Sequence, residues 1–441
     1  LFQLLSEDSQ TISVIWGLLM RLPVSEKTKK ALYEMTDSWE NLLGLRSMQQ
    51  FKLLYCLQII QQILYDTEIT TLNKGSENIE TEMKDQEWAK KFCETGGIKV
   101  LLKILLKSDL SKTTNSHKST AIMFRILSSF FKRFPNEVFD HSDQAEENKV
   151  AQKIIETLFQ ISKHSLKKET TRDSNHQHSI RVYDKINSEY IRIPEDQHYE
   201  AQAVLYIQTF FFQFAQYDPS LLVHLCQYPS LKSLLSIGLV ESDNTYLKEN
   251  FSQGLTSLLI HFSTMKALES APPHQTIFPI LLQDTLQKAL NNQKKSEVFF
   301  KMMTNLINSV DIGEVTLDCD DLLSQLVEFL KLRKPMEKNQ RDLDVVLHGV
   351  LLLLKALFAK YPEKAQKYGQ EEGLISELMQ SCLFEIPKRT YRKQIPGPKC
   401  KSASTRTAAF RLLIELTRQS HSNLEEVMRY IIPIHKFGKW R

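Results

Sequence analysis

The sequence predicts an all-α protein in which helical hairpins stack as an armadillo/HEAT-like α-solenoid. Apolar residues recur with helical spacing in at least fifteen segments of the 441 residues, and most connectors between them are short. So many helices leave no room for a parallel sheet, and thirteen glycines with fourteen prolines are too few for a β-sandwich. We therefore treat residues 1–441 as a single solenoid fragment with two or three irregular insertions.

The composition indicates which classes of partner are unexpected and which cellular compartment the cysteines suit. The net charge is +4 and the pI is about 8.5, so the charge balance gives no reason to expect nucleic acid. Six cysteines are scattered without a C-x-x-C spacing, which favours a reducing compartment, the cytosol or the nucleus. No uninterrupted apolar run reaches about eighteen residues, so we expect no membrane partner. The opening residues already follow an apolar pattern, and we expect the chain to be part of a longer one.

The first 86 residues predict three helices followed by an acidic connector. Apolar residues at helical spacing predict a helix over residues 11–22, which Pro23 ends, and a second helix begins near Ser25. A third helix covers residues 48–64. Residues 66–86 then lose this periodicity and carry six acidic against two basic residues, so they predict an exposed acidic loop.

A pair of glycines gives the strongest local signal. A short helix from Trp88 to Thr95 precedes Gly96 and Gly97, and a new amphipathic helix follows. Glycine at a helix end permits the left-handed cap, and a second glycine allows close helix packing. Read alone, the pair also suits an ordinary helix end in any helical domain. A similar turn at residues 368–375 favours repeated armadillo-like units, which run about forty residues and bury their faces by stacking.

The middle of the chain contains an insertion. Helices are predicted over residues 121–135 and 150–164, after which residues 165–198 hold many charges and no helical pattern. Isoleucine and valine alternate with polar residues in SIRVYDKINSEYIRIPED, which favours a small β-hairpin or an ordered insertion. Helices resume at Tyr199. The aromatic block Phe210–Phe214 covers most of a helix circumference, so we expect it to be buried.

The region before the last hairpin is strongly basic. Eight basic residues and no acid lie between Glu385 and Glu415, mostly in a predicted loop at residues 386–404. One interpretation is an anion-binding strip for an acidic partner, and the other is a solvated loop with no ligand. Tyr391 is the single aromatic in the loop, so a base-stacking platform is not indicated. The candidate partner-binding residues are Lys388, Arg389, Arg392 and Lys393.

Residues 402–441 predict a terminal hairpin of two amphipathic helices, with a capping turn between them at residues 420–423. Pro433 is expected to halt the second helix. The apolar faces are formed by Ala408, Ala409, Leu412, Leu413 and Leu416 in the first helix, and by Leu424, Val427, Met428, Ile431 and Ile432 in the second.

No pattern of residues supports catalysis or metal binding. A thiol hydrolase needs a cysteine that a histidine activates; Cys226 follows His224, but it and Cys93 lie on apolar stripes, where inert buried thiols are usual. His176 and His178, with His164 or His198, lack the ligand spacing of a zinc site. Nucleotide-binding and serine-hydrolase motifs do not occur. We expect no catalytic residue, no cofactor and no metal in this chain.

Four strings carry a resemblance to a known family. IWGLLMRLPVSEKTKKALYEM, KLLYCLQI, WAKKFCETGGIKVLL and TRTAAFRLLIELTRQSHSNLEEVMRYIIPIH resemble the helical region immediately upstream of the catalytic domain in very large, fat-facets-type ubiquitin-specific proteases. The resemblance does not place residues 66–86 and 165–198. It implies a thiol protease domain after residue 441, because nothing in the chain matches the family's nucleophile motif. It also implies a cytoplasmic or nuclear helical arm that recruits ubiquitinated substrates or adaptors, or that positions the adjacent protease domain.

The alternative is a free-standing armadillo-type adaptor without enzymatic activity. Adaptors of the nuclear-import type read basic peptides with Trp-x-x-x-Asn pairs, whereas the positions four after Trp16, Trp39 and Trp88 are Met20, Leu43 and Phe92. Helical-repeat RNA readers need base-contacting triplets at a fixed helix position, and the sequence has none.

Overall fold

The structure is a computed structural model. It describes residues 25–35, 38–43, 50–73, 79–107, 114–135, 144–168, 179–184, 189–217, 229–242, 244–266, 277–291, 296–309, 319–332, 340–371, 373–383, 402–418 and 420–437. Almost all of these residues are helical, which confirms the all-α prediction. The chain divides into two compact units, Leu1–Leu234 and Leu235–Arg441, although the sequence predicts one stack. Repeats in a stack contact only their neighbours, so contacts that hold distant repeats together are few.

The helices of the first unit pack on one another around α7 and α10. α7 packs against α4 on one side and against α10 on the other, and α10 also packs on α9. These contacts bury the predicted aromatic block, because Phe210 and Phe214 each lie edge-on to Phe131. The helices are α2 (Glu26–Glu34), α3 (Trp39–Leu42), α4 (Gln50–Asn73), α5 (Ile79–Glu94), α6 (Gly97–Lys107), α7 (Thr114–Arg133), α9 (Gln144–Lys168) and α10 (Glu195–Tyr217).

The glycine pair makes the predicted sharp turn between α5 and α6. Gly96 has φ +82°, a conformation that side chains other than glycine rarely adopt. Gly97 begins α6, and a Cβ there would lie 2.6 Å from the ring of Phe92. That ring is surrounded, because its centroid is 4.5 Å from Trp39 and 5.3 Å from Trp88. The string that resembles the protease family therefore supplies Trp88, Phe92 and Gly97 to an aromatic cluster that also contains Trp39 of α3.

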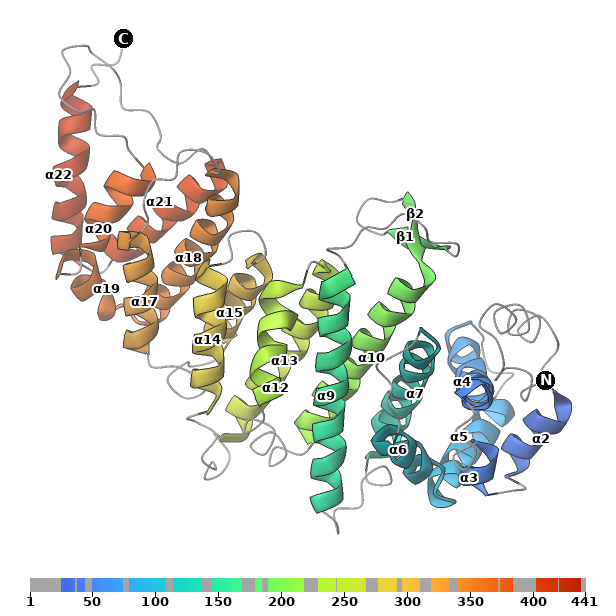
Figure 1. Ribbon diagram of the computed structural model, residues 1–441. Coiled ribbons are helices and arrows are strands. Elements are labelled where there is room, and N and C mark those ends of the chain that lie inside the picture. Colours follow the sequence, from blue (N-terminus) through green and yellow to red (C-terminus); the bar gives the residue numbers. More distant parts are fainter. Residues whose placement is uncertain are drawn as a thin grey trace. The chain divides into compact units, whose positions relative to one another are not determined.

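The second unit contains a series of helices in which each member packs on the next. α13 contacts α15, α15 contacts α18, and α18 contacts α21, so α18 lies between two neighbours (Figure 1). Its elements are η2 (Ile237–Glu241), α13 (Thr245–Lys266), α14 (Ile277–Asn291), α15 (Glu297–Ser309), α17 (Cys319–Leu332), α18 (Gln340–Lys360), α19 (Lys364–Gln366), η4 (Lys367–Glu371), α20 (Leu374–Glu377), η5 (Leu378–Leu383), α21 (Ala403–Arg418) and α22 (His421–Phe437), and α12 (Pro229–Ser236) contains the boundary with the first unit.

Two predicted loops are shorter than expected. α4 continues to Asn73 and α5 begins at Ile79, so the prediction of an acidic loop over residues 66–86 is wrong for most of that range. A helix that is already nucleated extends at little cost, and Glu, Met, Lys and Gln are good helix formers whatever their charge. Similarly, α9 extends into the 165–198 insertion as far as Lys168, and α10 begins before its end, at Glu195.

Between these helices lies an antiparallel hairpin of β1 (Ser179–Asp184) and β2 (Glu189–Pro194). The register pairs Ile180 with Ile193 and Val182 with Ile191, which places the alternating aliphatic residues at facing positions. The strands therefore follow the period-two pattern of the sequence.

Pro433 does not end the last helix. α22 runs from His421 to Phe437 and passes through the proline, so the prediction of a stop at this position is wrong. Proline removes a single backbone donor and weakens a helix by about 3 kcal/mol. The remaining hydrogen bonds of a helix can carry it past such a defect.

Candidate protein-binding surface

The terminal hairpin follows the residues that the sequence marks for partner binding, and α21 is its first helix. Ser402 caps α21, because its Oγ accepts a hydrogen bond from the N–H of Thr405 at 3.3 Å. The apolar face predicted for this helix is buried, at Ala408, Ala409, Leu412, Leu413 and Leu416. α21 packs on α18 and on η5.

Asn423 fixes the second helix of the hairpin to the first. Ser420 caps α22 by accepting the N–H of Asn423 at 3.3 Å. The Asn423 side chain is fully buried, and its Nδ2 donates to the carbonyl oxygens of Leu416 at 2.8 Å and Ala365 at 2.9 Å. Gly369 allows this approach, because a Cβ at that position would lie 2.6 Å from the Asn423 amide. One amide thus ties α22 to the end of α21 and to α19.

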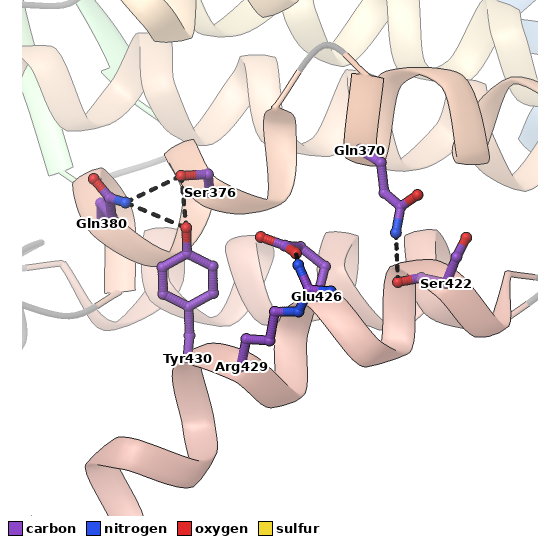
Figure 2. A network of polar contacts seen from close by, with 7 residues as sticks. All are labelled: Gln370, Ser376, Gln380, Ser422, Glu426, Arg429 and Tyr430. Carbon is purple, nitrogen blue, oxygen red and sulfur yellow. Dashed lines mark hydrogen bonds and ion pairs between the residues drawn. The ribbon is translucent and has the colours of Figure 1, made fainter.

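A polar network holds one side of α22 against the helices before it. Figure 2 shows the Tyr430 hydroxyl donating to Ser376 Oγ at 2.8 Å, with Gln380 Nε2 within 3.3 Å of Tyr430 and 3.0 Å of Ser376. Near the start of the helix, Gln370 Nε2 donates to the carbonyl oxygen of Ser422 at 2.7 Å (Figure 2). These contacts fix the rotation of α22 about its own axis.

This rotation leaves most of the predicted apolar face of α22 in solvent. Among the five apolar residues of the face, only Val427 is buried, at 7% exposed. The other four residues are exposed, and we call them the exposed stripe of α22. Their exposed fractions are 44% for Leu424, 41% for Met428, 41% for Ile431 and 44% for Ile432. The expectation that α22 repeats the buried pattern of α21 is wrong, because polar residues at positions 423 and 430 provide its contacts instead.

The candidate basic residues lie beside this hairpin in the sequence. Lys388, Arg389, Arg392 and Lys393 are outside the described residues, as are His176, His178, His224 and Cys226. α21 begins at Ala403, so the predicted basic loop at residues 386–404 is helical at its last two positions.

Three of the four cysteines that the structure describes are buried, and burial is unfavourable for nucleophilic chemistry. Cys93 is 8% exposed, Cys56 and Cys382 are each 1% exposed, and Cys319 is half-buried. Burial raises the pKa of Cys56 to about 11, although Lys52 partly opposes the shift. A neutral thiol is a weak nucleophile. Within the described residues, no three His, Cys, Asp or Glu side chains gather as a metal site, and no helix is long and apolar enough to cross a membrane.

The fold and this surface together define a helical protein whose last hairpin presents apolar side chains to solvent. Over 184 residues, 40% of the chain, the sequence is 28% identical to ubiquitin carboxyl-terminal hydrolase 34 of Homo sapiens, and it matches the Mus musculus protein equally. Over 143 residues, 32% of the chain, it is 28% identical to ubiquitin carboxyl-terminal hydrolase puf of Drosophila melanogaster. No protein-family model matches the sequence.

These matches confirm the resemblance to very large ubiquitin-specific proteases. The matched stretch covers 5% of the human and mouse proteins and 4% of the fly protein, so the chain spans a small part of these relatives. Sequence reasoning did not identify Asn423 as the residue that joins the hairpin. The available signal was a polar residue four positions before Val427, at a spacing where an apolar residue is usual on a buried face.

Proposed function

We propose that this chain is a non-catalytic helical arm of a large cysteine deubiquitinase. In this proposal, the arm binds ubiquitinated substrates or adaptor proteins, or positions the protease domain, and the chemistry takes place elsewhere in the protein. The partial identity to three ubiquitin carboxyl-terminal hydrolases carries the proposal. The buried Cys56 thiol, whose pKa is raised by its burial, agrees with a binding role.

The proposed mechanism is that of an α-solenoid of the armadillo/HEAT type. The successive packing of α13, α15, α18 and α21 supports such an arrangement within the second unit. Stacked hairpins of this kind provide an extended surface that binds partners through many weak contacts without moving reactive groups. We further propose that the basic residues of the 386–404 loop contact an acidic partner, because eight basic residues and no acid lie between Glu385 and Glu415. The proposed location is the cytoplasm or the nucleus.

The test compares a full-length relative with a variant from which the matched region is deleted. Deletion of the arm is expected to leave hydrolysis of a ubiquitin–fluorophore substrate unchanged and to reduce hydrolysis of a ubiquitinated protein. The purified 441-residue chain is expected to hydrolyse neither substrate. Turnover by this chain that is lost with Cys93→Ser or Cys226→Ser would contradict the proposal.

The alternative function is a free-standing armadillo-type adaptor. The two functions predict different behaviour of the same binding surface. An adaptor would retain its partners when no protease domain is attached, and the sequence encoded after residue 441 would lack the nucleophile motif.

A further inference from the structure

The exposed stripe of α22 has the spacing of a helix-pairing seam. Leu424, Met428 and Ile431 follow one another at intervals of four and three residues, and Ile432 flanks them. This alternation places apolar side chains along one line of a helix, where the a and d positions of a coiled coil lie. The spacing therefore indicates that the surface that covers the stripe is another helix.

Among the described residues, the main packing contacts of α22 lie on another side of the helix. α22 contacts α20, α21 and η4, and the side that does so carries Asn423, Val427 and Tyr430. The stripe occupies a different sector of the helix circumference, with each member between 41% and 44% exposed. Ile414 of α21, at 64% exposed, adds to the apolar surface of the same hairpin.

We propose that α22 pairs in antiparallel fashion with α22 of a second copy of this chain. A helix with an apolar stripe of the required spacing is available on the second copy, and two identical faces are self-complementary across a two-fold axis. An axis near Met428 sets Leu424 of each copy opposite Ile432 of the other. In this arrangement, α22 of the second copy covers all four residues of the exposed stripe.

Charges at the edge of the stripe fit the same arrangement. Glu425 and Arg429 lie on the flank next to the stripe, and their side chains are 62% and 74% exposed. With the axis near Met428, Glu425 of one copy comes within one helical turn of Arg429 of the other. The two-fold axis repeats this contact, so antiparallel pairing brings Glu425 of each copy close to Arg429 of the other. Parallel pairing does not produce this pair of contacts. Within one chain, Glu425 lies 3.4 Å from His421, and Arg429 lies 3.0 Å from Glu426.

Sedimentation velocity of the 441-residue chain over a concentration series tests the proposal. We expect a monomer–dimer equilibrium that Met428→Glu weakens at least about a hundredfold, because two carboxylates would then face each other at the axis. Ile432→Glu is the second variant. Leu332→Glu is the matched control, because Leu332 is 70% exposed on α17 of the same unit. Its substitution is expected to leave the dimer unchanged. Circular dichroism verifies that each variant is folded.

Two further measurements distinguish this arrangement from other dimers. In the Met428→Cys variant, oxidised glutathione is expected to produce a disulfide-linked dimer, whereas Leu332→Cys is expected to give none. Glu425→Arg and Arg429→Glu are each expected to weaken the dimer severalfold, and the double variant is expected to restore it. A wild-type chain that stays monomeric overturns the proposal. A dimer that survives both Met428→Glu and Ile432→Glu also overturns it and assigns the association to another surface.

Discussion

Replacing Asn423 is expected to separate the two helices of the terminal hairpin. In the Asn423→Ala variant, the carbonyl oxygens of Leu416 and Ala365 each lose a donor inside a fully buried site. Each of the two carbonyl oxygens, left buried without its donor, costs about 1–3 kcal/mol of stability. Asn423 Oδ1 is itself buried without a hydrogen-bond partner, so its removal returns part of this loss. We expect a net destabilisation of about 2–3 kcal/mol.

Asn423→Asp is a sharper test, because it keeps the size of the side chain and removes its donors. A carboxylate facing two carbonyl oxygens is costlier than a methyl group, although the start of a helix favours a negative charge by about 0.3–1 kcal/mol. We expect this variant to be less stable than Asn423→Ala at neutral pH. Burial favours the protonated carboxyl, so its folded-state pKa is raised, and the variant should regain stability as the pH falls below that pKa. The protonated group can donate one hydrogen bond.

Native-state hydrogen exchange, followed by mass spectrometry of peptides from α21 and α22, measures these effects. A single denaturation curve is less suitable, because two compact units need not unfold together. Asn305→Ala is the matched control, since Asn305 is exposed on α15, and its substitution should change stability by less than about 0.5 kcal/mol. Equal protection in wild type and Asn423→Ala would refute the assigned role of the amide. So would an Asn423→Asp variant as stable as wild type.

Four other substitutions test the packing and the electrostatics. Gly369→Ala should destabilise the wild type by about 1–3 kcal/mol, but most of this loss should vanish in the Asn423→Ala background, as a double-mutant cycle would measure. Gly97→Asn should be strongly destabilising, because the Phe92 ring against Gly97 is enclosed. Gly96→Asn should be only mildly destabilising, since asparagine tolerates the left-handed conformation. Comparable melting temperatures for the two variants would contradict this. Burial raises the Cys56 pKa from 9.0 to about 11, so its neutral thiol favours the fold fully below about pH 9 and loses about 2–3 kcal/mol of that stability as the pH rises to about 11. Unfolding measurements across this range should show the decline in wild type and a flatter profile in Cys56→Ala.

Helical spacing was sufficient to predict the helices whose apolar face packs against a neighbour. The buried face of α21 and the turn at Gly96 follow directly from apolar spacing and from the conformational freedom of glycine. Charge was a poorer guide, because residues 66–73 and 79–86 are helical despite their acidity. Backbone hydrogen bonds and propensity, rather than net charge, determine whether such a segment is a helix. The end of α22 was missed for a related reason, since one proline removes one donor and leaves the others in place.

The pattern of α22 indicates which of its residues are apolar but not what covers them. α21 and α22 carry similar apolar stripes, yet the stripe of α21 is buried on α18 and that of α22 is exposed. Polar residues made the difference, because the bonds of Asn423 and Tyr430 set the rotation of α22, and long-range hydrogen bonds of this kind have no periodicity in a sequence. A helix can therefore be amphipathic for the sake of a partner as well as for its own core. The exposed stripe is thus most informative when it is tested with Asn423 intact, because loss of that amide would alter the rotation that exposes it.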